Sequence, residues 1–166
     1  MIHAIDVAAT QVGIAEETGN NDGIPAERYM RGDKLAWCAG FVLYCYAHSD
    51  DDNIEKRESE WWKFRKVSTM LDAMKMRGVV LPRGLVPTRN DLIFYGNRAG
   101  SDKGRGTHVG IVERVVVEKR DAKFAANVYT IEGNLSDKVC RRVVSLDDKS
   151  VVAFARPARY TPHHLA

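Results

Sequence analysis

Residues 36–47 have the sequence AWCAGFVLYCYA, and this stretch decides the fold. It is almost unbroken in small, apolar and aromatic side chains, so no polar face is left to lie against water. Such a composition predicts a helix buried on all sides, beginning near Trp37 and running through Ala47. The acidic run Ser49-Asp50-Asp51-Asp52 then ends it.

Further helices are expected on both sides of this buried segment. Residues 2–17 predict an amphipathic helix ending before Gly19, with its apolar face made by Ile2, Ile5, Ala9 and Val12. Residues 20–25 (NNDGIP) predict a turn-rich loop. Residues 60–77 predict one or two more helices, with four probable core side chains: Trp61, Phe64, Leu71 and Met74.

The pattern changes to strands after Pro87. Five are expected: Leu92–Tyr95, Val109–Val117, Asn127–Glu132, Val139–Val144 and Val151–Ala155. Between the first two, Gly96–Gly106 is glycine-rich and predicts a flexible hairpin loop. Helices first and an antiparallel sheet second predict an α+β fold, since a doubly wound parallel sheet would alternate the two element types.

The size and balance of the chain suit one globular domain. Its 166 residues are 45% apolar and 28% charged, and we place the domain at 1–158 with a C-terminal tail at 159–166. The net charge of +3 comes from 25 basic and 22 acidic residues spread along the chain. This excess is too weak to indicate nucleic-acid binding, but it favours approach to an anionic polymer.

The three cysteines and the N-terminus bear on the compartment. Cys38, Cys45 and Cys140 are odd in number and lack CxxC spacing, so neither a disulfide framework nor a zinc site is expected. No apolar run approaches the roughly 18 residues of a membrane span, and the first residues do not resemble a signal peptide. We expect synthesis in the cytoplasm, no membrane insertion, and an export route supplied by another component.

Cys38 stands where the buried helix should begin. A cysteine nucleophile acts as the thiolate, which a helix N-terminus and a nearby histidine favour. A free cysteine is also commonly a small buried apolar residue, and taken alone Cys38 fits that description better. Its chemical role therefore depends on what the rest of the chain brings near it.

Two later stretches carry groups that could complete such a site. His108 opens the apolar run Val109–Val112, which puts an imidazole at a strand end where it can act as a general base. Glu132 and Asn134 lie two residues apart, on the same side if the strand extends that far, and either could orient the histidine. The alternatives are a surface histidine and an ordinary hairpin end.

Taken in order, five motifs resemble the cysteine, histidine-dependent amidohydrolase/peptidase (CHAP) family, in particular phage endolysin catalytic domains. They are WCAGFV (37–42), DLIFY (91–95), HVGIV (108–112), IEGN (131–134) and ARP (155–157). The resemblance covers nearly the whole chain. One departure is Arg89-Asn90-Asp91, where the family usually has Pro-Gly-Asp.

The resemblance implies a papain-like fold of N-terminal helices on an antiparallel sheet. It also implies Cys38 as nucleophile, His108 as base, Glu132 as the group orienting the imidazole, and Asn134 as a polar helper. We expect substrate contacts from Trp37, Tyr29 and Asp91; a groove could also involve Arg31, Lys34 and Trp61. No cofactor is expected. Neither Asn20 with Asp22 nor Asp50 with Asp52 completes a calcium loop, so we expect solvated acidic turns and no metal.

The implied activity is hydrolysis of an amide bond in bacterial peptidoglycan, by an N-acetylmuramoyl-L-alanine amidase or an endopeptidase. It would serve phage lysis or cell-wall attack, acting after release or delivery with a holin, immunity protein or virion partner. Two alternatives stay open. One is a Cys-His amidase acting on a small conjugate such as glutathionylspermidine. The other is a non-catalytic wall-binding or virion module.

Overall fold

The computed structural model describes residues 1–51, 63–96, 106–120 and 123–157. Within them, the helices are α1 (Ala4–Gln11), α2 (Gly23–Met30), α3 (Cys38–Ala47) and α4 (Val67–Met76). The strands are β1 (Leu92–Tyr95), β2 (His108–Arg120), β3 (Lys123–Leu135), β4 (Lys138–Ser145) and β5 (Val151–Ala155). They form one antiparallel sheet in the order β4-β3-β2-β1-β5, so the expected α+β class is confirmed. No described helix is long and apolar enough to cross a membrane.

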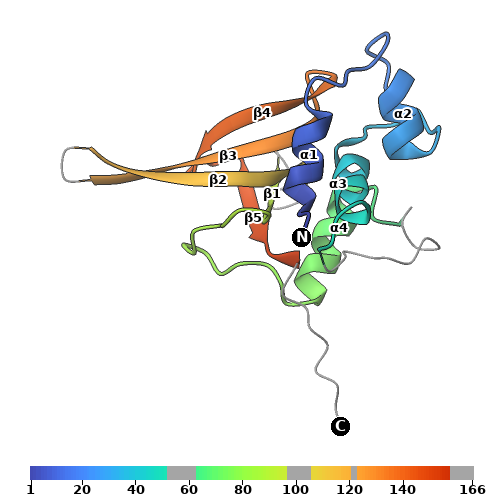
Figure 1. Ribbon diagram of the computed structural model, residues 1–166. Coiled ribbons are helices and arrows are strands. Elements are labelled where there is room, and N and C mark those ends of the chain that lie inside the picture. The colour runs from blue at the N-terminus through green and yellow to red at the C-terminus, as the bar shows by residue number, and fades with distance from the viewer. Residues whose placement is uncertain (52–62, 97–105, 121–122, 158–166) are drawn as a thin grey trace.

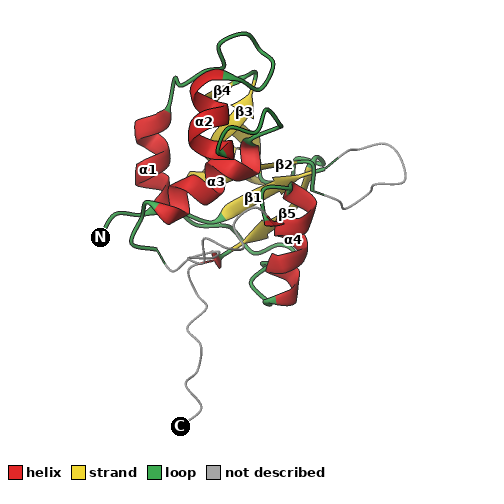
Figure 2. Ribbon diagram, turned by 90° about the vertical axis from the view of Figure 1, so that its right-hand side faces the viewer, coloured by secondary structure: helices red, strands yellow, loops and turns green. Residues whose placement is uncertain are grey.

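The sheet separates two apolar clusters. Alternate side chains of β1 point to opposite faces, so Leu92 and Phe94 pack with the helices while Ile93 and Tyr95 join the other cluster. Figures 1 and 2 show the helices gathered on one side of the sheet. The buried helix α3 contacts both β2 and β3. Its position brings the N-terminus of α3 to the central strands, where the candidate chemistry lies.

The hairpin of β2 and β3 is longer than the sequence pattern predicts. Each strand has 13 residues, and the pair projects beyond the helices (Figure 1). The ladder continues to Arg120 opposite Lys123, although Val117 and Phe124 are 56% and 75% exposed. Backbone pairing extends these strands past the buried core, which is why hydrophobic alternation underestimates their length.

The first helix is shorter than expected and uses a different face. It ends at Gln11, not near residue 17, because Gly13 turns with φ of 96° and its N–H donates to the Val139 carbonyl. Chain segment 13–16 thereafter runs beside the turn between β3 and β4. Of the expected apolar face only Ile5 is buried; the buried positions are Ala4, Ile5, Ala8 and Gln11.

The remaining helices agree unevenly with expectation. Helix α2 begins inside the stretch expected to be loop, since Pro25 is tolerated in a first helical turn. Helix α3 matches its expected range, and α4 starts seven residues later than the predicted segment. Three of the four expected core side chains there, Phe64, Leu71 and Met74, are confirmed as buried. The fourth, Trp61, lies outside the described residues, as do most of Gly96–Gly106 and the tail 159–166.

Candidate active site

Cys38 is the first residue of α3 and is 5% exposed. Trp37 precedes it as the N-cap residue, and the Trp37 carbonyl accepts the first helical hydrogen bond, from Phe41 N–H. The helix approaches β3 closely at Gly133, where an added Cβ would lie 2.6 Å from Phe41 Cβ. Glycine at this position therefore lets the helix N-terminus sit against the strand that carries Glu132.

His108 is the first residue of β2, and its ring faces Glu132 on the neighbouring strand β3. The Nε2 atom lies 2.8 Å from Glu132 Oε2; the histidine side chain is 19% exposed and the glutamate fully buried. Space for the glutamate comes from Gly110, where an added Cβ would lie 2.6 Å from Glu132 Cγ. Gly110 of the HVGIV motif thus makes room for the Glu132 side chain, and Gly133 of the IEGN motif makes room for α3.

Cys38 also interacts with the imidazole of His108. Because Nε2 faces Glu132, Nδ1 is the nitrogen left for the Cys38 sulfur. Burial by itself lowers the pKa of His108, but the hydrogen bonds with Cys38 and Glu132 outweigh it and raise the pKa to about 9. The ring therefore holds its proton at neutral pH, as a thiolate–imidazolium pair requires.

Glu132 is held by donors on both oxygens. Tyr95 and Thr130 hydroxyls each donate to Oε1 at 2.6 Å, and His108 binds Oε2. Burial acts to raise the pKa of Glu132, yet these hydrogen bonds lower it overall, so the side chain remains a carboxylate. Burial also raises the pKa of Tyr95, which keeps its hydroxyl a donor.

Asn134, expected as a polar helper near the oxyanion or the histidine, is joined to the loop before α2. It takes a left-handed conformation (φ 55°) and its amide donates to Asn21 Oδ1 at 3.1 Å. Asn21 N–H in turn donates to Glu16, whose other carboxylate oxygen accepts the indole N–H of Trp37. Asn134 is thereby linked, through the loop before α2, to the residue preceding Cys38.

The three residues expected to contact substrate are buried and already have partners. Trp37 and Tyr29 are fully buried and stack with ring centroids 5.4 Å apart. Asp91 is 2% exposed and accepts two hydrogen bonds of 2.7 Å from Arg156. Their contacts give each a place in the interior. Of the possible groove residues, Arg31 and Lys34 are exposed and Trp61 lies outside the described residues.

The turn before β1, where the sequence has Arg89-Asn90-Asp91, contains a residue with positive φ. Asn90 has φ of 74°, a left-handed conformation that asparagine tolerates better than most residues. On either side of Asn90, Arg89 forms an ion pair with Asp6 and Asp91 forms one with Arg156. This arrangement fastens the start of β1 to both α1 and the end of β5.

Sequence reasoning missed Tyr95, Thr130 and Arg142 near the Glu132 carboxylate. Thr130 had a signal, because residues two apart on a strand share a face. Tyr95 closes the DLIFY motif, but only the pairing of Tyr95 with His108 reveals its position. Arg142 comes from β4, and no spacing in the sequence links it to the site.

The expected solvated acidic turns are partly wrong. Asp22 is 8% exposed and accepts hydrogen bonds from Thr18 N–H and Oγ1. Asp50 is exposed, as expected, and accepts the N–H of Ile2, whereas Asp52 lies outside the described residues. Throughout the part of the chain that the structure describes, no group of three or more His, Cys, Asp or Glu side chains is placed to hold a metal ion.

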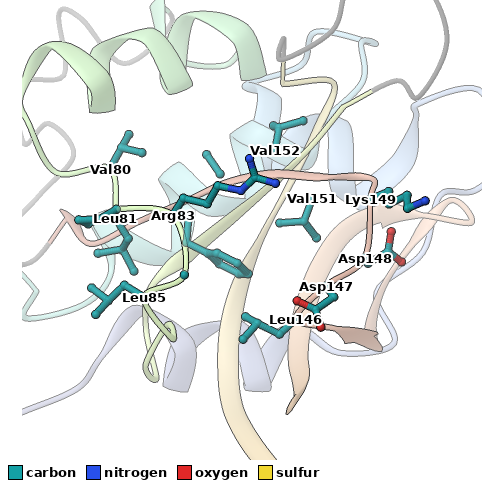
Figure 3. Close-up of a pocket in the computed structure, with 14 residues that line it drawn as sticks. Val80, Leu81, Arg83, Leu85, Leu146, Asp147, Asp148, Lys149, Val151 and Val152 are labelled. Carbon is teal, nitrogen blue, oxygen red and sulfur yellow. The ribbon is translucent and has the colours of Figure 1, made fainter. Parts of the chain in front are cut away.

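A cavity of about 590 Å³ lies apart from the Cys38–His108 pair. Figure 3 shows Val80, Leu81, Arg83 and Leu85 on one side, opposite residues 146–149 and the strand β5. None of Cys38, His108 and Glu132 lines it. The volume of this cavity therefore has no bearing on the chemistry of the site.

Comparison with known proteins gives no relative. No family model, curated protein or solved structure matches this chain.

Proposed function

We propose that the protein is a cysteine hydrolase that cleaves an amide bond of bacterial peptidoglycan, with a papain-like fold of the CHAP type. The observation that carries the proposal is the row of three side chains at the N-terminus of α3. His108 interacts with Cys38 and lies 2.8 Å from the buried carboxylate of Glu132. A nucleophile, a base and a group that orients the base recur in this order in covalent hydrolases.

In the acylation step the Cys38 thiolate attacks the amide carbonyl and forms the S–C bond. The imidazolium of His108 then gives its proton to the leaving nitrogen as the C–N bond breaks. The backbone N–H groups at the start of α3 have no partner within the helix and face the developing negative charge. Glu132 keeps the proton of Nε2 in place throughout, so that Nδ1 does the proton transfer.

Hydrolysis of the acyl-enzyme reverses these roles. His108 takes a proton from water, the hydroxide attacks the thioester carbon, and the S–C bond breaks to release the carboxylic acid and the thiolate. No oxidant, metal or further reactant enters this balance.

Peptidoglycan is proposed as substrate because the five motifs follow the CHAP order along the chain. The net charge of +3 is favourable for approach to an anionic wall. The reaction products show whether the muramoyl-L-alanine amide or a peptide bond is cut. A stem peptide freed whole from the glycan indicates an amidase, and a divided stem indicates an endopeptidase.

The test is digestion of purified peptidoglycan, followed by loss of turbidity and by mass spectrometry of the released peptides. Cys38→Ser should abolish release, whereas Cys140→Ser, in a partly buried cysteine outside the triad, should retain it. Equal activity of the parent and Cys38→Ser would overturn the proposal. Turnover of glutathionylspermidine without any effect on walls would replace the substrate. Wall pulldown that survives Cys38→Ala, with no cleavage by either form, would indicate a binding module.

A further inference from the structure

The Glu132 carboxylate is surrounded by side chains from four of the five strands of the sheet. Besides His108 of β2, it receives Tyr95 from β1 and Thr130 from β3, each at 2.6 Å. Arg142 of β4 is the fourth of these side chains, and its Nη1 atom lies 3.7 Å from Oε2 of Glu132. The Arg142 guanidinium also lies over the Tyr95 ring, 4.5 Å from its centroid.

We propose that Tyr95 and Arg142 are positioning residues of the hydrolase, acting on His108 through Glu132. The inference rests on the proposed role of the Cys38–His108 pair and adds what controls it. Two hydroxyl donors on Oε1 fix the rotation of the carboxylate, so that Oε2 points at the histidine ring. Tyr95 is 4% exposed and Thr130 fully buried, so water does not replace either donor freely.

Arg142 supplies the charge that this arrangement otherwise lacks. A thiolate at Cys38, an imidazolium at His108 and a carboxylate at Glu132 sum to one negative charge in a largely buried space. The guanidinium cancels it, and with its side chain 32% exposed it is itself partly hydrated. No hydrogen bond from this guanidinium to another described residue is formed, so its role here is electrostatic and by stacking on Tyr95.

Among the described residues, the titratable groups beside His108 and Glu132 other than Cys38 and Arg142 are neutral, so the sign of the effect is defined. Tyr95 is neutral, and Cys140, opposite Glu132 across β3 and β4, has its pKa raised mainly by burial and is neutral too. Removing the Arg142 charge takes away a cation that opposes protonation of His108. Removing the Tyr95 hydroxyl leaves a more basic carboxylate beside the imidazolium. Both changes should move the alkaline titration of His108 upward.

The experiment is the pH dependence of Cys38 alkylation by iodoacetamide in the Cys140→Ser background, measured by mass spectrometry between pH 5 and 11. It reports the thiol–imidazole pair directly and needs no peptidoglycan. In the parent the upper inflection is expected near pH 9, the pKa of His108. Arg142→Gln and Tyr95→Phe should shift it upward by at least half a pH unit, and Arg142→Lys should restore the parent position.

The chain offers a matched control in Arg114 and Tyr129. There an arginine also stacks on a tyrosine, with Cζ 3.9 Å from the ring centroid, on the same sheet but without contact with Glu132. Arg114→Gln and Tyr129→Phe should leave the inflection unchanged. Circular dichroism and melting temperature show whether each variant is folded.

The outcomes separate this inference from the proposed activity. The positioning role would be overturned if the alkylation profiles of folded Arg142→Gln and Tyr95→Phe matched those of the parent and the controls, even if peptidoglycan is cleaved. Shifted profiles in a protein that leaves peptidoglycan intact would support the positioning role and reject the substrate. With an active enzyme, Tyr95→Phe should lower kcat about tenfold and leave KM nearly unchanged, because a charge-assisted hydrogen bond to a remote group is lost.

Discussion

The Nε2 atom of His108 lies 2.8 Å from Oε2 of the fully buried Glu132, and the same imidazole interacts with Cys38. A carboxylate at Nε2 accepts a hydrogen bond from the N–H there and leaves the opposite nitrogen to exchange a proton with the thiol. The buried glutamate thus determines which nitrogen performs the chemistry.

Glu132→Gln should inactivate the protein without unfolding it. The Tyr95 and Thr130 hydroxyls would hold the glutamine oxygen at the Oε1 position, which turns its NH₂ toward His108. The ring then presents a bare Nε2 and a protonated Nδ1, which cannot accept the thiol proton. We expect loss of activity on peptidoglycan by a factor of about 10² to 10⁴.

The control for this variant is Glu113→Gln, which removes a carboxylate from β2 at the surface, where it pairs with Arg141. Its activity should stay within about twofold of the parent, as expected for an exposed ion pair. Full activity of Glu132→Gln would show that the glutamate does not set the tautomer.

The stability of the protein should depend on pH through His108. Its pKa is raised from 6.5 to about 9, so the folded state binds this proton more tightly than the unfolded chain. The resulting stabilisation is complete below pH 6.5 and is lost as the pH rises through 9. Compared with His108→Gln, the parent should lose on the order of 3 kcal/mol of unfolding free energy over this range.

Urea denaturation at half-unit steps from pH 6 to 10 measures this difference. His48→Gln serves as the control, since the His48 ring at the end of α3 bonds the Tyr44 carbonyl and lies against the Tyr44 ring. It should keep the slope of the parent. A His108→Gln variant with the same slope as the parent would contradict the assignment. Activity should decline over the same alkaline range, because the leaving amine needs the imidazolium proton.

The sequence predicts well the elements whose buried residues form one short stretch of the chain. Helix α3 and strands β1 and β5 match their expected ranges because their apolar runs are short, continuous and bounded by polar residues. The outer half of the β2–β3 hairpin is held by strand pairing with little burial, so hydrophobicity does not mark its end. The face of α1 was misjudged because contacts with α3, distant in sequence, decide it.

The candidate site divides in the same way. Cys38 and His108 each begin an element, which a sequence pattern can mark. Tyr95 and Arg142 meet only because β1 and β4 flank the central strands, and strand order is not written in local spacing. Asn134 was expected to share a face with Glu132, but the register shifts after Glu132 and its left-handed backbone breaks the alternation.

The pair of Asp91 and Arg156 should contribute to stability more than to activity. Asp91 is buried, the Arg156 side chain is 14% exposed, and two hydrogen bonds join them, so Asp91→Ala leaves a largely covered guanidinium without its carboxylate. We expect a loss of about 3 kcal/mol in unfolding free energy. Activity per folded molecule should persist. A selective rise in KM for Asp91→Ala, with stability unchanged, would instead favour the substrate contact expected from sequence.

Asp33 and Arg65 provide the comparison for that pair. Their ion pair is more exposed, with side chains 51% and 30% exposed. Asp33→Ala should cost less than about 1 kcal/mol. The double variant Asp91→Ala/Arg156→Ala should lose less than the sum of the two single losses, because the second change removes the charge that the first leaves unpaired.

Asn134→Ala should lower activity only modestly, because Asn134 acts on the site through other residues. Its amide donates to Asn21, and from there hydrogen bonds lead through Glu16 to Trp37, next to Cys38. Loss of one such bond should lower kcat/KM about two- to tenfold, and Asn21→Ala should do the same. The two changes should not add, since either one breaks the same link. A direct role at the oxyanion would appear as a loss of about 10² to 10³ in Asn134→Ala that Asn21→Ala does not reproduce.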